Sequence, residues 1–128
     1  MIKVIYFLKR KEGTTFEQFR SHYESSHVVL GKKYIGHLLN DYVRNYPTFA
    51  FRNPSNIPEG TTPTPYDIGY DCITEMHVEN QAAIDEMTRI FNDPEINPIL
   101  AEDELRFLDR EATVMIMVEV VNNGTKLA

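Results

Sequence analysis

The sequence predicts a single α+β domain of ferredoxin-like βαββαβ order, built on one four-stranded antiparallel sheet. Four short segments have the apolar patterns of β-strands, and helical patterns with a 3.6-residue period follow the first and the third of them. The length of 128 residues suffices for one hydrophobic core but not for two. We therefore treat residues 1–128 as one domain.

The first strand and the first helix have the clearest patterns. A strand is expected over residues 2–9, with apolar side chains on both faces. Gly13 marks a turn, and Thr14 or Thr15 can cap the helix that follows. Its apolar stripe spans about 80° and consists of Phe16, Phe19, Tyr23 and His27. Beyond the stripe, Gly31 and Gly36 interrupt the pattern of residues 28–39.

A second strand, a long loop and a third strand follow. Residues 40–46 alternate and place Tyr42, Arg44 and Tyr46 on one face. Residues 47–65 contain five of the seven prolines, which predicts a loop without regular structure. This loop is either a lid or binding segment, or a solvated insertion. Residues 68–78 predict a strand with Cys72, Thr74 and Met76 on one face and Asp71, Glu75 and His77 on the other.

The remaining elements complete the order. Asn80 is the expected cap of a second helix, whose apolar stripe ends near Phe91. Asn97 followed by Pro98 predicts the start of a shorter helix that runs to Leu108. The last strand, residues 112–121, is apolar on both faces, and residues 122–128 are expected to fray.

Composition excludes several classes of protein. A net charge of −6 argues against nucleic-acid binding, which needs clustered Lys and Arg. No apolar run reaches the roughly 20 residues of a membrane span, and no signal peptide opens the chain, so we expect a cytoplasmic protein. The single cysteine, Cys72, is expected to be a buried, inert thiol. The four histidines lack metal-site spacing, so no metal is expected.

A second copy of the chain is the expected partner. Helices cover one face of such a sheet, yet the first and last strands are apolar on both faces. At about 25 cal/mol per Å² of apolar surface, leaving several Val, Ile and Leu side chains in water would forfeit several kcal/mol, comparable with the stability of a small domain. The sequence therefore predicts an isologous homodimer packed through its sheets.

Four blocks of the sequence resemble the EthD family of the dimeric α+β barrel superfamily. They are the opening residues 2–20, the pair Tyr23 and His27, residues 41–45, and residues 103–109. The resemblance implies a cofactor-independent domain with a small-molecule cavity between the helices and the sheet. Related proteins include a methylmuconolactone isomerase, polyketide dehydratases or decarboxylases, and an accessory protein of ether degradation. The isomerase-like members place a tyrosine and a histidine at the positions that match Tyr23 and His27.

His27 and Tyr23 are the leading catalytic candidates. A histidine can take and return a proton near neutral pH, which suits enolisation, dehydration, decarboxylation or lactone opening next to a carbonyl. Tyr23 could orient the imidazole or donate to a developing oxyanion. The structural alternative is a core tyrosine and a helix-end histidine that hydrogen-bond locally. His22, about 100° from the stripe, is expected at the solvent edge of the helix, where it could contact substrate.

The sheet supplies the other candidates. Asp71 and Glu75 would lie on the pocket floor and act as acid or base, or else they are exposed or paired at the solvent or dimer rim. Tyr42, Arg44 and Tyr46 could bind an anionic or aromatic ligand, or simply pack.

Three functions remain open. The first is a cofactor-free lyase or isomerase that acts on a small aromatic, polyketide-like or lactone substrate. The second is a non-catalytic ligand-binding accessory protein, and the third is a cofactor-free monooxygenase.

Overall fold

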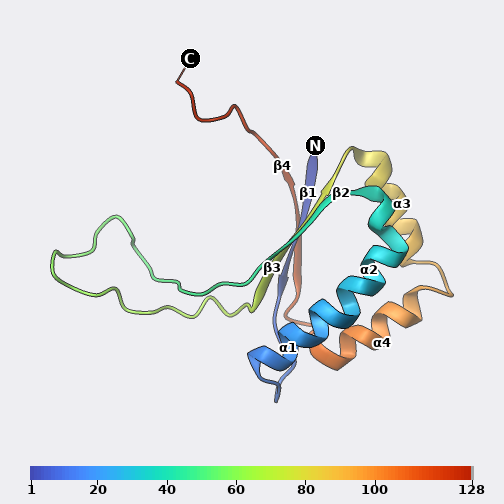
Figure 1. Ribbon diagram of the computed structural model, residues 1–128, viewed down its shortest axis with the longest axis horizontal. Coiled ribbons are helices and arrows are strands. Elements are labelled where there is room, and N and C mark those ends of the chain that lie inside the picture. Colours follow the sequence, from blue (N-terminus) through green and yellow to red (C-terminus); the bar gives the residue numbers. More distant parts are fainter. Residues whose placement is uncertain (128) are drawn as a thin grey trace.

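The computed structural model describes residues 1–127 and has the predicted topology. Its four strands form one antiparallel sheet in the order β2-β3-β1-β4 (Figure 1). They are β1 (Ile2–Leu8), β2 (Leu39–Asn45), β3 (Cys72–Val78) and β4 (Val114–Glu119). The two central strands, β3 and β1, are therefore paired on both sides, and β4 is an edge strand. The ferredoxin-like α+β prediction is confirmed.

All the helices cover one face of this sheet (Figure 1). The first helical rod is continuous and consists of α1 (Phe16–His22), the π-helical segment η1 (Tyr23–His27) and α2 (Val28–Ile35). A short 3₁₀ turn, η2 (Gly36–Leu38), leads into β2. The other two helices are α3 (Gln81–Phe91) and α4 (Asn97–Phe107).

Side-chain caps start two of these helices. The amide of Gln18 donates to Thr15 Oγ1 (3.1 Å), and the Thr15 amide donates to Gln18 Oε1 (2.9 Å). This reciprocal capping box satisfies amide groups that the first turn leaves free. Asn80 Oδ1 accepts from the Ala83 amide (3.1 Å) in the same way. Of the two threonines that could cap the first helix, Thr15 does so and Thr14 does not, and Asn80 caps α3 as expected.

Three elements differ from the sequence-based expectation by more than one residue. The first helix continues through Gly31 to Ile35 instead of breaking up. Strand β3 begins at Cys72, not at residue 68, because Gly69 has φ +80° and turns the chain out of the extended conformation. Strand β4 is limited to Val114–Glu119. Residues 120–127 form a tail without helix or strand, and Ala128 lies outside the described residues.

The core lies between the helices and one face of the sheet. On β1 and β3 this face carries Val4, Leu8, Cys72, Thr74, Met76 and Val78. Two clusters pack against it: one centres on Phe19, Tyr23 and Phe107, and the other on Ile35, Met87 and Ile90. Cys72 is fully buried, and burial raises the pKa of its thiol to about 11. The thiol is accordingly neutral in the folded protein.

The opposite face of the sheet is left open. No helix covers it, and Val114 and Ile116 of edge strand β4, which pair with Phe7 and Ile5 on this face, are 42% and 38% exposed. The segment between β2 and β3, residues 46–71, forms an extended arm that projects on this open side, and so does the tail (Figure 1). None of the helices within residues 1–127 has the length and hydrophobicity needed to cross a bilayer.

Candidate functional site

The candidate site is organised by the π turn in the first helical rod. The Val28 amide donates to the carbonyl oxygen of Tyr23, five residues earlier, which closes a turn wider than that of an α-helix. In an α-helix two residues five apart point about 140° away from each other. The wider turn brings His22 and His27 to the same side of the rod. Single π turns of this kind often occur at functional sites.

Both histidines bind one buried carboxylate. Asp103 of α4 is 3% exposed. Its Oδ1 accepts from His22 Nε2 (2.9 Å) and Ser26 Oγ (2.8 Å), and its Oδ2 accepts from His27 Nδ1 (2.9 Å). Burial by itself raises the pKa of the Asp103 carboxyl, but these hydrogen bonds outweigh burial and hold the pKa below its ordinary value. Asp103 is therefore an ionised acceptor for three donors.

The carboxylate also fixes where the imidazole protons lie. An ionised carboxylate only accepts hydrogen bonds, so His27 presents a proton on Nδ1 and His22 presents one on Nε2. Phe107 packs against both imidazoles, with ring centroids 5.1 Å from each. When His27 is neutral, its Nε2 consequently carries a free lone pair.

His27 Nε2 faces a cavity of about 400 Å³ between the helices and the sheet. The volume lies in the usual range of small-molecule sites. Most of the lining is apolar or aromatic, and it comes from β1, β2, β3, α2, α3 and α4 through Tyr6, Leu8, Tyr42, Met76, Ile35, Phe91 and Leu100. The predicted cavity between helices and sheet is present.

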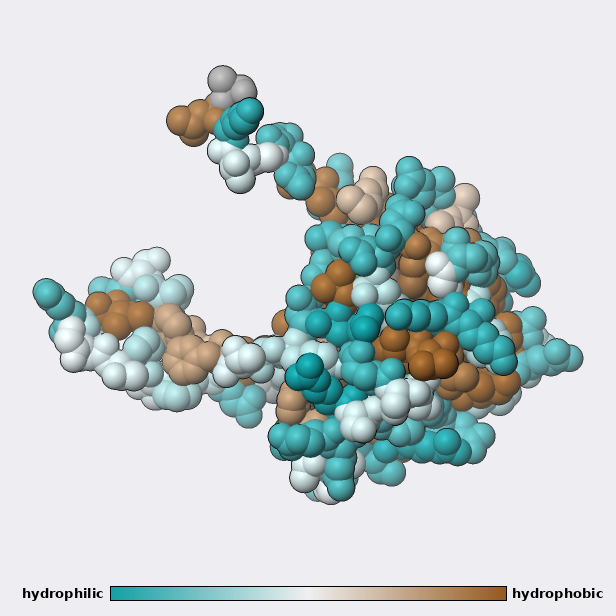
Figure 2. Space-filling model, in the orientation of Figure 1, coloured by the Kyte–Doolittle hydropathy of each residue, from teal (hydrophilic) through white to brown (hydrophobic). Residues whose placement is uncertain are grey.

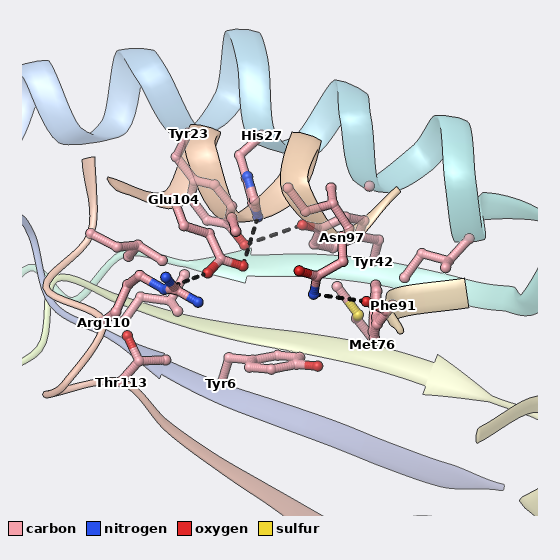
Figure 3. A pocket seen from close by; sticks show the side chains of 16 residues that line it. Tyr6, Tyr23, His27, Tyr42, Met76, Phe91, Asn97, Glu104, Arg110 and Thr113 are labelled. Carbon is pink, nitrogen blue, oxygen red and sulfur yellow. Dashed lines mark hydrogen bonds and ion pairs between the residues drawn. The ribbon is translucent and has the colours of Figure 1, made fainter. Parts of the chain in front are cut away.

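Polar groups gather at one end of the cavity (Figure 3). His27 points from its helix toward Glu104 of α4, whose Oε1 lies 4.0 Å from Nε2, too far for a hydrogen bond. Arg110 Nε lies 3.1 Å from the other oxygen of Glu104. Within residues 1–127, His27 Nε2 makes no hydrogen bond. This nitrogen is open to a ligand.

Three tyrosines line the cavity, and their hydroxyl groups differ in whether they are hydrogen-bonded. Tyr23 OH is hydrogen-bonded to Thr74 Oγ1 (2.6 Å) and to Tyr42 OH (3.2 Å). Tyr6 OH has no hydrogen-bond partner within the described residues. Burial, followed by the charge of Glu104, raises the pKa of Tyr6, so its hydroxyl stays protonated. Tyr6 OH is thus a free donor on the sheet side of the cavity (Figure 3).

Tyr23 is a buried support and does not orient the imidazole. It is 2% exposed, and burial is the main cause that raises its pKa far above the ordinary value. Its ring stacks on Phe107, with centroids 5.5 Å apart. The residue that orients His27 is Asp103, for which the sequence indicated no catalytic role.

The predicted substrate-binding residues divide into two groups. Tyr42 lines the cavity. Arg44 on β2 and Tyr46, which directly follows the strand, instead bind Glu24. Arg44 donates through Nε (3.0 Å) and Nη2 (2.8 Å), and Tyr46 donates through its hydroxyl. These bonds tie β2 to the π turn and leave neither side chain facing the cavity. His22 is 27% exposed at the helix edge and likewise lies outside the cavity lining.

The prediction that the face of β3 bearing Asp71 and Glu75 forms the pocket floor is wrong. Glu75 lies on the open side of the sheet, because Met76 and its alternate neighbours face the helices, and Asp71 lies just before β3, outside the cavity lining. Asp71 binds Arg10 (2.9 Å), and Glu75 binds Lys3 (3.0 Å). The bond from Lys3, followed by that from Asn45, lowers the pKa of Glu75 to about 2. Both carboxylates are paired, as the alternative interpretation held.

Two acidic residues of the site, Asp103 and Glu104, were missed. They belong to the block 103–109, which carries part of the family resemblance. In the local sequence they sit in an acidic run that is typical of a solvated helix face. Asp103 and His27 are 76 residues apart in the sequence. Only the packing of α4 on the π turn brings the two acidic residues next to the His27 imidazole.

Within residues 1–127, no group of three or more His, Cys, Asp or Glu side chains is arranged to hold a metal ion. We therefore describe His22, Asp103 and His27 as a hydrogen-bonded network.

Comparison with known proteins points to one family. The model of the EthD domain matches residues 11–111. An EthD-like protein from Ralstonia eutropha JMP134 superposes with a TM-score of 0.62 at 16% identity, over 97% of this chain and 95% of that one. An EthD family protein from Bacillus halodurans C-125 gives a TM-score of 0.58 at 16% identity, over 94% and 99%.

A third similar structure bears on assembly. It is a dimeric protein of unknown function with a ferredoxin-like fold from Bacteroides fragilis NCTC 9343, with a TM-score of 0.52 at 12% identity, over 93% of this chain and 95% of that one. No curated protein matches the sequence at a significant level. At these identities the structural likeness establishes the fold.

Proposed function

The chain belongs to the EthD family, and from this premise we propose that it is a cofactor-independent lyase or isomerase that uses His27 for proton transfer. One observation carries the proposal. A buried carboxylate holds Nδ1 of His27, while Nε2 faces a cavity and makes no hydrogen bond within residues 1–127. An imidazole held in this way by a carboxylate is the arrangement of a general base in many enzymes.

The proposed chemistry begins with a proton on a carbon next to a carbonyl group of the substrate. Neutral His27 takes this proton on Nε2, and the electron pair of the broken C–H bond moves into the carbonyl to give an enolate. The imidazolium that forms lies 2.9 Å from the Asp103 carboxylate, which stabilises its charge. The proton then returns to another atom of the substrate or to a leaving group. Return to carbon gives isomerisation, and return to a leaving hydroxyl gives dehydration.

Tyr6 is the best-placed donor for the enolate oxygen. Its hydroxyl is protonated and free, and it lies across the cavity from His27 (Figure 3). A donor aimed at a developing oxyanion in a largely apolar cavity is a major source of catalysis. Tyr23 supports the site indirectly, because its hydroxyl links Tyr42 to Thr74 on the sheet.

The cavity supports a small hydrophobic substrate with one polar end. About 400 Å³ of mostly aromatic and aliphatic lining suits an aromatic, polyketide-like or lactone compound of one to three rings. The polar end of such a compound would lie by His27 and Glu104. Arg110, paired with Glu104 and about half exposed, is available to a carboxylate or phenolate there.

We also propose that the protein acts as a homodimer. The uncovered face of the sheet, with Val114 and Ile116 of β4 exposed on it, supports this, and so do similar structures that are described as dimeric. A second copy on this face would leave the cavity, which lies on the helix side, accessible.

Conversion of a compound panel by wild-type protein and by the His27→Gln variant tests the activity. The panel should contain aromatic ketones, β-keto acids and lactones, with mass spectrometry as the readout. His27→Gln should lower turnover by about 100-fold or more while the dissociation constant of the substrate changes little. His37→Gln is the matched control, because His37 is exposed and outside the cavity.

The same panel separates catalysis from simple binding. Equal turnover by wild-type protein and His27→Gln would refute the assignment. Tight binding of a panel compound that is recovered unchanged would instead identify a ligand-binding accessory protein.

A further inference from the structure

The arm, residues 46–71, is firmly anchored at its base and unsupported beyond it. At the base, the Asp71 amide donates to the Leu8 carbonyl (2.8 Å), and both oxygens of the Asp71 carboxylate accept from Arg10. Farther out the two halves of the arm run side by side, and the Tyr66 amide donates to the Ala50 carbonyl (2.7 Å). The arm then projects away from the rest of the domain (Figure 1).

The composition of the arm is unlike that of a solvated loop. Only four of its 26 residues are charged, and it carries several large apolar side chains. Phe49 is 56% exposed and Tyr66 is 41% exposed. The rings of Phe49 and Phe51 lie 5.4 Å apart, and the guanidinium of Arg52 lies 4.1 Å from the Tyr66 ring centre. The arm thus presents a preformed aromatic surface that the domain itself leaves in water.

The direction in which the arm projects indicates what it could contact. It extends on the side of the sheet that no helix covers, and the tail, residues 120–127, extends on that side as well (Figure 1). Figure 2 shows these two projections separated by an open concave space. The floor of this space is the open face of the sheet, where Ile5 and Phe7 of β1 and their β4 partners Ile116 and Val114 remain partly exposed.

We propose that the arm clasps a second copy of this chain seated on the open face, with Phe49 and Tyr66 packed against that copy. A two-fold related pair would exchange two identical arms, so that each aromatic contact is made twice. The scarcity of charge on the arm favours a protein surface with apolar patches as its occupant. Similar structures described as dimeric make a second copy the partner that best fits this face. The inference rests on the homodimer proposed above and adds the segment that fastens it.

Sedimentation measurements of the dimer dissociation constant test the clasp. The test variant is Phe49→Ser combined with Tyr66→Ser. Both side chains are largely exposed in the single chain, so the protomer should still fold. We expect an increase of roughly 100-fold in the dissociation constant, equivalent to about 2.8 kcal/mol. Val29→Ser is the matched control, since Val29 is 57% exposed on α2, on the helix side of the domain.

A shortened arm provides a second variant. Replacing residues 51–65 by Asn-Gly joins the two halves where Ala50 and Tyr66 are already paired, because Asn-Gly forms a tight two-residue turn. This variant should weaken the dimer by at least tenfold. Circular dichroism should match that of the wild-type protein for both variants.

The outcomes separate the clasp from the dimer and from the chemistry. A dissociation constant within threefold of the wild-type value for the serine double variant would refute the clasp and leave the homodimer intact. A wild-type protein that stays monomeric at high micromolar concentration would overturn the clasp and the homodimer together. Neither result would change the turnover test on His27.

Discussion

Replacing Asp103 by asparagine should change the protons around His27 while keeping the shape of the side chain. In the wild-type protein Oδ1 accepts from His22 and Ser26, and Oδ2 accepts from His27 alone. An asparagine has one oxygen and one NH₂ group. The asparagine oxygen should stay next to His22 and Ser26, because then only His27 has to change from hydrogen-bond donor to acceptor. The NH₂ group will consequently face His27 Nδ1.

His27 must then accept a hydrogen bond on Nδ1 and carry its proton on Nε2. The lone pair that faces the cavity is lost, and so is the carboxylate that stabilises the imidazolium. In Ser-His-Asp enzymes the equivalent substitution lowers turnover about 10⁴-fold through the wrong tautomer. For a single proton transfer we expect a decrease of about 1,000-fold, which is about 4 kcal/mol of transition-state stabilisation.

Nitrogen-15 NMR of the imidazoles measures this change without a substrate. At about pH 8.5, above the range in which imidazoles ordinarily titrate, wild-type His27 should carry its proton on Nδ1 and His22 on Nε2. In Asp103→Asn, His27 should switch to Nε2, and His22 serves as the internal control that does not switch. A variant in which His27 keeps its proton on Nδ1 and its turnover is normal would refute this reasoning.

Tyr6→Phe and Tyr23→Phe should separate catalysis from support. Tyr6→Phe should lower turnover by about 10- to 100-fold with little change in stability, because its hydroxyl has no partner within residues 1–127. Tyr23→Phe should lower the free energy of unfolding by about 1 to 2 kcal/mol in a denaturant titration, since it removes a buried hydrogen bond to Thr74 and a partly buried one to Tyr42. A stability loss in Tyr6→Phe with normal turnover, together with a turnover loss in Tyr23→Phe with normal stability, would contradict both assignments. Gly31→Ala should stabilise the protein by about 0.5 to 1 kcal/mol, because alanine is the better helix former. The new Cβ would lie 3.5 Å from a ring carbon of Tyr42, which is an ordinary contact. A lower melting temperature would show that the cavity wall cannot adapt. Glu75 has a lowered pKa of about 2, so its contribution to stability is complete above about pH 4.5 and is lost as the pH falls toward 2. Glu75→Gln should therefore lose less stability than the wild-type protein over this interval in acid titrations, and an unchanged pH dependence would contradict the pairing with Lys3.

The fold could be predicted from the sequence because its strands and helices have strong periodic patterns. The stripe of Phe19 and Tyr23, for example, is buried on α1 and η1 as the 3.6-residue period indicates. The start of β3 was placed too early because Tyr70 and Asp71 continue the alternation of the strand. The left-handed turn at Gly69 interrupts this alternation.

The candidate site could be predicted only in part. The sequence places His27 on the buried stripe, but it does not reveal the π turn that brings His22 to the same carboxylate. Asp103 was not found because a charged residue in an acidic helical run ordinarily faces water. The wrong face of β3 was chosen because alternation defines two faces without saying which one the helices cover.

Hydrogen–deuterium exchange into small ketones and lactones tests the central claim most directly. Wild-type protein in D₂O should place deuterium on the carbon next to the carbonyl of a compound that binds in the cavity, and mass spectrometry detects each exchanged atom. We expect His37→Gln to exchange at the wild-type rate and His27→Gln to exchange at least 100-fold more slowly. Equal exchange rates for His27→Gln and wild-type protein would contradict the account.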